Sequence, residues 1–154
     1  MRLLLLLVFL ALPVVCIAAD GDDKVIKVDK DDKEMLSAFD KARKSIDKVI
    51  AMITSGKLSK YHIKIQVKDD NGVEYFWLSD VKLNGDTFTG KIDNDPEIVK
   101  NVKNGDEKSI SKLEIYDWMY TKDKKIYGNY TLRVLLKKMD KDEAAKYKAM
   151  LAPE

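Results

Sequence analysis

Apolar residues recur every three or four positions from residue 34 to residue 54, which is the spacing of one buried stripe on an α-helix. The segment Asp31-Asp32-Lys33-Glu34 precedes the stripe and supplies a helix N-cap with a carboxylate in the first turn. Ser55-Gly56 follows the stripe and is typical of a helix end. We therefore predict an N-terminal helix that covers one face of a sheet. Its stripe comprises Met35, Phe39, Ala42, Ile46, Val49, Ile50 and Ile53.

Beyond Gly56 the apolar positions alternate with polar ones, the pattern of a strand with one buried face. Residues 61–67 form the first such strand, and Asn71-Gly72 favours a tight hairpin turn into a second strand over 73–78. Another turn is predicted at Asn84-Gly85. The remaining predicted strands cover 87–92, 107–111 and 113–120.

Three helical segments complete the pattern. Asp95 and Pro96 favour a short helix that ends at Asn104-Gly105. Residues 129–138 and 140–151 predict two C-terminal helices, the second of which begins with a capping box. Short connections between the strands favour antiparallel pairing. The predicted fold is α+β: an antiparallel sheet of four to five strands packed against the N-terminal helix and the two C-terminal helices.

The N-terminal sequence predicts export. An uncharged run from Leu3 to Val15 follows Met1-Arg2 and ends in small residues, as in a cleavable signal peptide over residues 1–19. The run is too short for a good anchor, because a membrane crossing takes about 20 apolar residues. We expect cleavage after Ala18 or Ala19 and no stable membrane span afterwards. Lipidation of Cys16 is a rival outcome, which Val15 disfavours.

The exported part is predicted to be a flexible charged leader over residues 20–33 and a single α+β domain over residues 34–154. Cleavage would remove the only cysteine, so the fold must be held by its hydrophobic core. The 28 Lys and Arg and the 26 Asp and Glu of the whole chain are interleaved. Because no field of one sign results, we do not expect nucleic acid as a partner.

The residue inventory excludes most of the well-marked enzyme classes. With no cysteine after the signal and a single histidine, His62, the chain lacks thiol nucleophiles, cysteine-based zinc sites and two-histidine metal motifs. It also lacks the nucleophile elbow and a complete phosphate-binding loop. We interpret His62 as an ordinary surface histidine, and we expect no cofactor, no metal and no catalytic residue.

Aromatic and polar residues gather at the ends of the predicted elements. Trp and Tyr combine a large apolar area with a polar tip, which suits a surface for a protein or a sugar. Alternatively, the tryptophans fill the core, and Arg133 forms a structural ion pair with Asp93 or Asp117. We favour the core interpretation for the tryptophans. The candidates for a ligand- or partner-binding site are Trp77, Asp93, Asn94, Asp117, Trp118, Tyr130 and Arg133.

Six motifs in order resemble the YegJ-like family of bacterial exported proteins, a domain of unknown function. The motifs are Trp77–Val81, Gly85–Gly90, Asp93–Val99, Asn104–Asp106, Ile115–Tyr120 and Gly128–Arg133. The resemblance covers roughly residues 61–151. It implies a bacterial origin, and hence a periplasmic location for an exported chain, but it implies no catalytic residue, cofactor or reaction.

Three hypotheses about function follow. We favour a non-catalytic module that binds an envelope protein or a cell-wall component through the cluster around Trp77 and Trp118. The second hypothesis is a carboxylate-dependent hydrolase of envelope glycan, with Asp93 and Asp117 as acid and base. The third is an inhibitor or immunity protein that inserts an exposed loop, such as 93–97, into a hostile enzyme.

Overall fold

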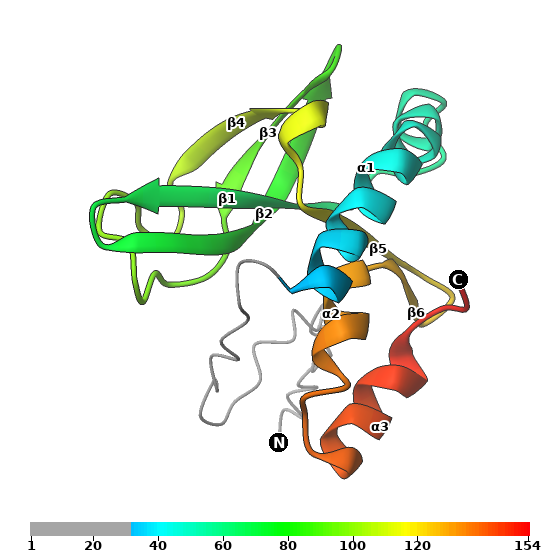
Figure 1. Cartoon of the computed structure of the whole chain (residues 1–154). Coiled ribbons are helices and arrows are strands. Elements are labelled where there is room, and N and C mark those ends of the chain that lie inside the picture. Colours follow the sequence, from blue (N-terminus) through cyan, green and yellow to red (C-terminus); the bar gives the residue numbers. More distant parts are fainter. Residues whose placement is uncertain (1–31) are drawn as a thin grey trace, which may run out of the picture.

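A computed structural model describes residues 32–154 of the chain (Figure 1). The predicted signal peptide, Cys16 and most of the charged leader lie outside the described residues. Only the last two residues of that leader, Asp32 and Lys33, are described, and they belong to the start of the first helix.

The helix α1 (Lys33–Thr54) matches the predicted N-terminal helix. Asp32 caps it, because its Oδ1 accepts hydrogen bonds from the amides of Glu34 and Met35, both at 3.0 Å. The residues that α1 buries follow the first five positions of the predicted stripe, with Ala38 added, while Ile50 and Ile53 are only partly buried. They are Met35, Ala38, Phe39, Ala42, Ile46 and Val49.

Six strands form one sheet in the order β4-β3-β2-β1-β5-β6, and every neighbouring pair is antiparallel. The α+β class and the antiparallel sheet are therefore confirmed, while the strand count is slightly higher than the predicted four to five. The hairpin turn is confirmed too, because Asp69 pairs with Gly72. The strands are β1 (His62–Asp69), β2 (Gly72–Asn84), β3 (Thr87–Ile92), β4 (Glu107–Ser111), β5 (Asp117–Lys122) and β6 (Lys125–Gly128).

The main core lies between α1 and the sheet. Ala42 and Ile46 of α1 cluster with apolar side chains that alternate along the strands, such as Ile63 and Phe76. A smaller cluster joins the first half of α1 to α2 (Tyr130–Leu135) through Phe39 and Val134. The helix α1 thus contacts both the sheet and α2, and it crosses the sheet in Figure 1.

The C-terminal part returns to the sheet edge. Asp140 caps α3 (Lys141–Met150), as predicted, by accepting from the amide of Asp142. The segment after α3 then pairs with β6, because the amide of Ala152 donates to the carbonyl of Ile126 at 2.8 Å. This pairing brings residues 151–154 back beside α2.

Two local predictions are wrong. The predicted helix over 95–104 is an irregular segment, since its amides bond to side chains of the β1–β2 hairpin: the amides of Glu97, Ile98 and Val99 all donate to the carboxylate of Glu74. The predicted strand over 113–120 begins with a 3₁₀ turn, η1 (Lys112–Glu114), so that β5 starts only at Asp117. The strand β6 was not predicted.

Candidate functional site

The structure separates the seven candidate residues into three places. Trp77, Asp93 and Asn94 lie where β2 and β3 pair, and Asp117, Trp118 and Tyr130 meet where β5 faces the start of α2. Arg133 lies farther along α2, beside the chain segment that follows α3.

Asp117 is fully buried, and four donors surround its carboxylate. Oδ2 accepts from the amide and the hydroxyl of Thr131 at 2.8 and 2.7 Å, and Oδ1 accepts from the amides of Trp118 and Tyr130 at 2.9 and 3.2 Å. Burial raises the pKa of Asp117, while the ammonium of Lys64 and these hydrogen bonds oppose that rise. This carboxylate fixes the first turn of α2 to β5, and it has no exposed surface to offer a substrate.

Lys64 connects the two clusters of candidates. It pairs with Trp77 on β2 and with Asp117 on β5, so both side chains flank it. Its Nζ lies 4.5 Å from the centroid of the Trp77 ring and donates to the hydroxyl of Thr131 at 2.7 Å. Burial lowers the pKa of Lys64, and the negative charge of Asp117 opposes that shift. The result is a chain of polar contacts that runs from the half-buried Lys64 through Thr131 to the buried Asp117.

The pairing of β2 and β3 explains the positions of Trp77, Asp93 and Asn94. The amide of Asp93 donates to the carbonyl of Trp77 at 3.0 Å, and the amide of Trp77 donates to Asn94 Oδ1 at 3.3 Å. These contacts continue the pairing of β2 and β3 beyond Ile92, the last residue of β3. Trp77 is half-buried and Asp93 is exposed.

Trp118 is a core residue, as the favoured interpretation of the tryptophans has it. It is 7% exposed, and its Nε1 donates to the carbonyl of Ala42 and to Ser45 Oγ at 3.2 and 3.0 Å. The ring of Tyr130 meets it edge-on, with 5.6 Å between the ring centroids. Trp118 therefore joins β5, α1 and α2 in the interior.

His62 is half-buried rather than exposed at the surface. Its Nδ1 is buried without a hydrogen-bond partner among the described residues. Burial lowers the pKa of His62, while the charge of Asp93, the backbone of Leu78 and the charge of Asp80 each raise it. The neutral imidazole is thus the form that the fold favours.

Tyr130 and Arg133 line a hollow of about 350 Å³ between α1, α2 and the segment after α3. Arg133 is held firmly there: its Nη2 donates to the carbonyl of Ala152 at 2.7 Å and its Nε to that of Gly128 at 3.3 Å. The other lining residues are Lys33, Glu34, Ser37, Ala38, Lys41, Val134, Lys137 and Glu154.

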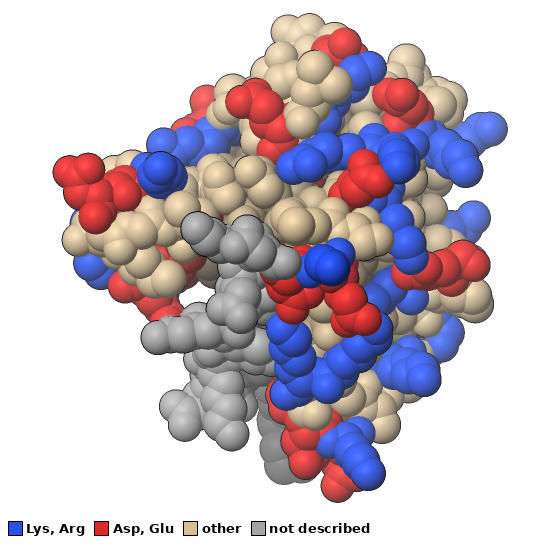
Figure 2. Space-filling model, in the orientation of Figure 1, with Lys and Arg blue, Asp and Glu red and all other residues tan. Residues whose placement is uncertain are grey.

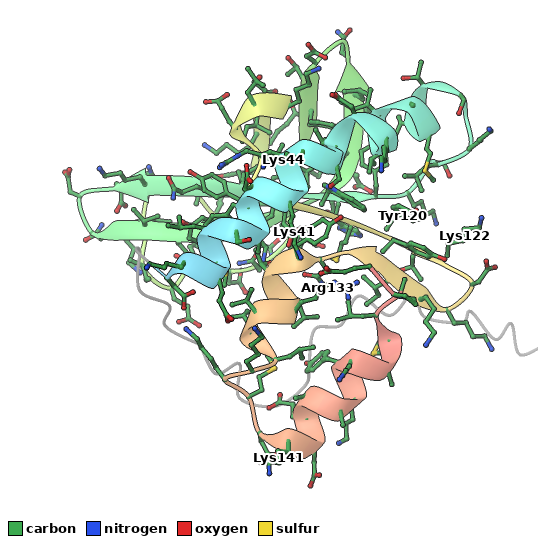
Figure 3. All side chains as sticks on the ribbon, turned by 45° about the vertical axis from the view of Figure 1, so that its right-hand side comes forward. Lys41, Lys44, Tyr120, Lys122, Arg133 and Lys141 are labelled. Atoms are coloured by element: carbon green, nitrogen blue, oxygen red, sulfur yellow. The ribbon has the colours of Figure 1, made fainter. Side chains whose placement is uncertain are left out.

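Cations outnumber carboxylates in this hollow. Lys137 Nζ lies 2.6 Å from Glu34 Oε1, and Glu154 bridges two cations, with Oε2 at 2.8 Å from Lys41 Nζ and Oε1 at 3.6 Å from Arg133 Nε. Lys and Arg are prominent over the lower right of the molecule in Figure 2, where α2 and α3 lie in Figure 1. Figure 3 shows Lys41 on α1 above Arg133 on α2. The hollow is therefore suited to an anionic group.

Within residues 32–154, no group of three His, Cys, Asp or Glu side chains is placed to hold a metal ion. None of the helices in that range combines the length and the apolar character that a bilayer crossing needs.

The candidates predicted from the sequence include Tyr130 and Arg133 of the hollow but none of the residues that surround them. Lys41 and Lys137 are two among 28 basic residues, and nothing local marks them. Lys64 carried a usable signal: the hairpin turn places it opposite Trp77. Thr131 carried none, because its partner Asp117 lies on a different element.

Comparison with known proteins confirms the family resemblance. Residues 32–152 match the family described as "Uncharacterized protein conserved in bacteria (DUF2314)". The chain is 38% identical over 133 residues to "Uncharacterized protein YegJ" of Escherichia coli (strain K12). The aligned residues cover 86% of this chain and 87% of the relative. It is 26% identical over 82 residues to a putative ankyrin repeat protein of Neisseria meningitidis serogroup B. This alignment covers 53% of this chain and 32% of that protein. No solved structure gives a significant match.

Proposed function

Because the chain belongs to the bacterial family DUF2314, we propose that it is a non-catalytic binding module of the cell envelope. Its contact site is the cationic hollow between α1 and α2. The partner is an envelope protein or a cell-wall component that presents an anionic group. The module works in the periplasm, after the signal peptide has been removed.

One observation carries this proposal: four cationic side chains, from α1, from α2 and from the turn after α2, line a single hollow. Lys33 and Lys41 come from α1, Arg133 comes from α2, and Lys137 comes from the turn that follows α2. The carboxylates of Glu34 and Glu154 offset them only in part. Tyr130 and the apolar side chains of Ala38 and Val134 complete the lining. A lining that combines apolar side chains with a few charged and polar groups is typical of a ligand-binding pocket.

The binding test uses a photocrosslinking residue in place of Ser37, which lines the hollow, in the living bacterium. We expect a specific adduct with an envelope component, and we expect Lys41→Glu and Lys137→Glu to abolish it. Lys44→Glu is the matched control, because Lys44 lies one helical turn from Lys41 but pairs with Asp40 outside the hollow. An adduct that still forms in both charge-reversal variants, Lys41→Glu and Lys137→Glu, would refute the hollow as the binding site.

The location has its own test. Intact-mass measurement of the native product should give a chain that begins near residue 19 or 20, without lipid. A product that retains Met1, or carries a diacylglycerol on Cys16, would contradict the proposed location and leave the hollow as a binding site.

A second candidate function rests on the loop 93–97. Asp93, Asp95 and Glu97 are exposed, while Glu74 anchors the loop by accepting from the amide of Glu97 at 3.0 Å. An anchored acidic loop suits an inhibitor that inserts into a basic cleft. Co-purification with a toxin that Asp93→Ala and Asp95→Ala abolish, and Lys41→Glu does not, would favour this candidate. The burial of Asp117 argues against the hydrolase hypothesis, because a fully buried carboxylate does not reach a glycan.

A further inference from the structure

We infer that the hollow recognises a glutamate side chain of an acidic protein segment, and that Glu154 competes for the same place from within the chain. The inference rests on the proposed function of the hollow. It adds the class of ligand and a means of regulating access to the site.

The carboxylate of Glu154 shows what the hollow accepts. Its two oxygens reach cations on different helices, Lys41 Nζ of α1 at 2.8 Å and Arg133 Nε of α2 at 3.6 Å. These cations lower the pKa of Glu154, so the group is held as the anion. A single carboxylate thus spans the gap between α1 and α2.

The chain is anchored at Ala152, two residues before Glu154, while the side chain of Glu154 stays partly exposed. Ala152 is 2% exposed and is bonded on both sides, with its amide to Ile126 and its carbonyl to Arg133. The side chain of Glu154 is 44% exposed and that of Lys41 is 53% exposed. Exposed ion pairs of this kind are weak, so an external carboxylate can displace Glu154 without disturbing Ala152.

The surroundings favour a carboxylate on a methylene stem over a phosphate. Arg133 already donates to two backbone carbonyls, so its guanidinium does not present a free fork to a phosphate. Glu34 lies in the same lining and would repel a dianion. Ala38 and Val134 offer apolar contact to a short stem. A glutamate side chain meets all three conditions.

The test is an NMR titration of the whole chain, as isolated, with glutamate blocked at both ends, comparing the native protein with Glu154→Gln. We expect shifts at the amides of Ser37 and Val134, and about two- to fivefold tighter binding in the variant, the range that corresponds to a surface ion pair. In the Glu154→Gln background, Lys41→Ala should weaken the binding and Lys44→Ala should leave it unchanged.

Each other outcome overturns a stated part of the inference. Equal affinity of the native protein and Glu154→Gln would refute competition. Binding of blocked glutamine as tight as that of blocked glutamate, or tighter binding of inorganic phosphate, would refute the ligand class. If blocked glutamate fails to bind but the Ser37 adduct persists and depends on Lys41, the inference is wrong and the proposed function stands. Loss of both refutes both.

Discussion

The carboxylate of Asp117 accepts hydrogen bonds from both the amide and the hydroxyl of Thr131, at 2.8 and 2.7 Å, in the interior between β5 and α2. Thr131 in turn accepts from Lys64 Nζ on β1. A single threonine therefore connects an anion and a cation that belong to different strands. The stability of the junction between the sheet and α2 depends on this arrangement.

Asp117→Asn should lower the free energy of unfolding by about 3 kcal/mol, because it replaces an acceptor oxygen with a donor among buried donors. Urea denaturation measures the change. Asp93→Asn, at an exposed carboxylate, is the control and should change stability by less than about 0.5 kcal/mol. Equal effects of the two substitutions would show that Asp117 does not secure α2.

Lys64→Met and Thr131→Val should be non-additive. Each removes one end of the 2.7 Å bond between Lys64 Nζ and Thr131 Oγ1, so we expect a coupling of roughly 1 kcal/mol in a double-mutant cycle. The cycle is measured by urea denaturation of the two single variants and the double variant. Additive effects would mean that the two side chains act independently.

Gly128→Ala should destabilise the fold by about 3 kcal/mol or more. Gly128 has a φ angle of 76°, and a Cβ there would overlap with the carbonyl oxygen and the indole ring of Trp118. Gly56→Ala is the matched control: its φ angle is 71°, but a Cβ there meets nothing within 4 Å. The control should cost only about 1 kcal/mol for its backbone angle. Similar losses for both variants would contradict a close approach at Gly128.

Stability should fall as the pH drops below about 6.5, the pKa of His62 in the unfolded chain. The folded pKa of His62 is lowered, so in this range the unfolded chain binds more protons than the native one. Urea midpoints at about pH 7.5 and pH 5 measure the loss, and His62→Gln should reduce it. Asp32, Asp69 and Glu154, whose pKa values are also lowered, act only at more acidic pH. The same slope in both proteins would contradict this role of His62.

The sequence predicts well those elements whose signals are local. The cap at Asp32 and the stripe behind it define α1, and the Asn71-Gly72 turn defines the β1–β2 hairpin. Each signal involves neighbours within a few positions of the chain. Tertiary contacts did not override these local preferences.

The failures have the opposite cause. The segment 95–104 carries a helix-start pattern, but Glu74 on β2 takes the amides that a helix would use. The strand β6 is short, and its pairing with β5 and Leu151 decides its conformation. In both cases a partner distant in the sequence prevails over the local pattern.

The candidate site likewise combines features that the sequence predicts with features that depend on tertiary contacts. Aromatic and polar chemistry identified Tyr130 and Arg133, which do line the hollow, together with Asp117 and Trp118, which are buried. Composition does not distinguish a buried tryptophan from an exposed one. It also does not show which basic residues of α1 and of the segment 133–137 line the same hollow, since that depends on how α1 and α2 pack.

The strand order β4-β3-β2-β1-β5-β6 also bears on how the molecule assembles. The strands β1, β2 and β3 are consecutive in the chain and adjacent in the sheet, so their pairing closes short loops. The pairing of β1 with β5 must instead bring together residues separated by three intervening strands. Because long loops close slowly, we expect the three-stranded unit of β1, β2 and β3 to form early. The addition of β5 to β1 should then limit the folding rate.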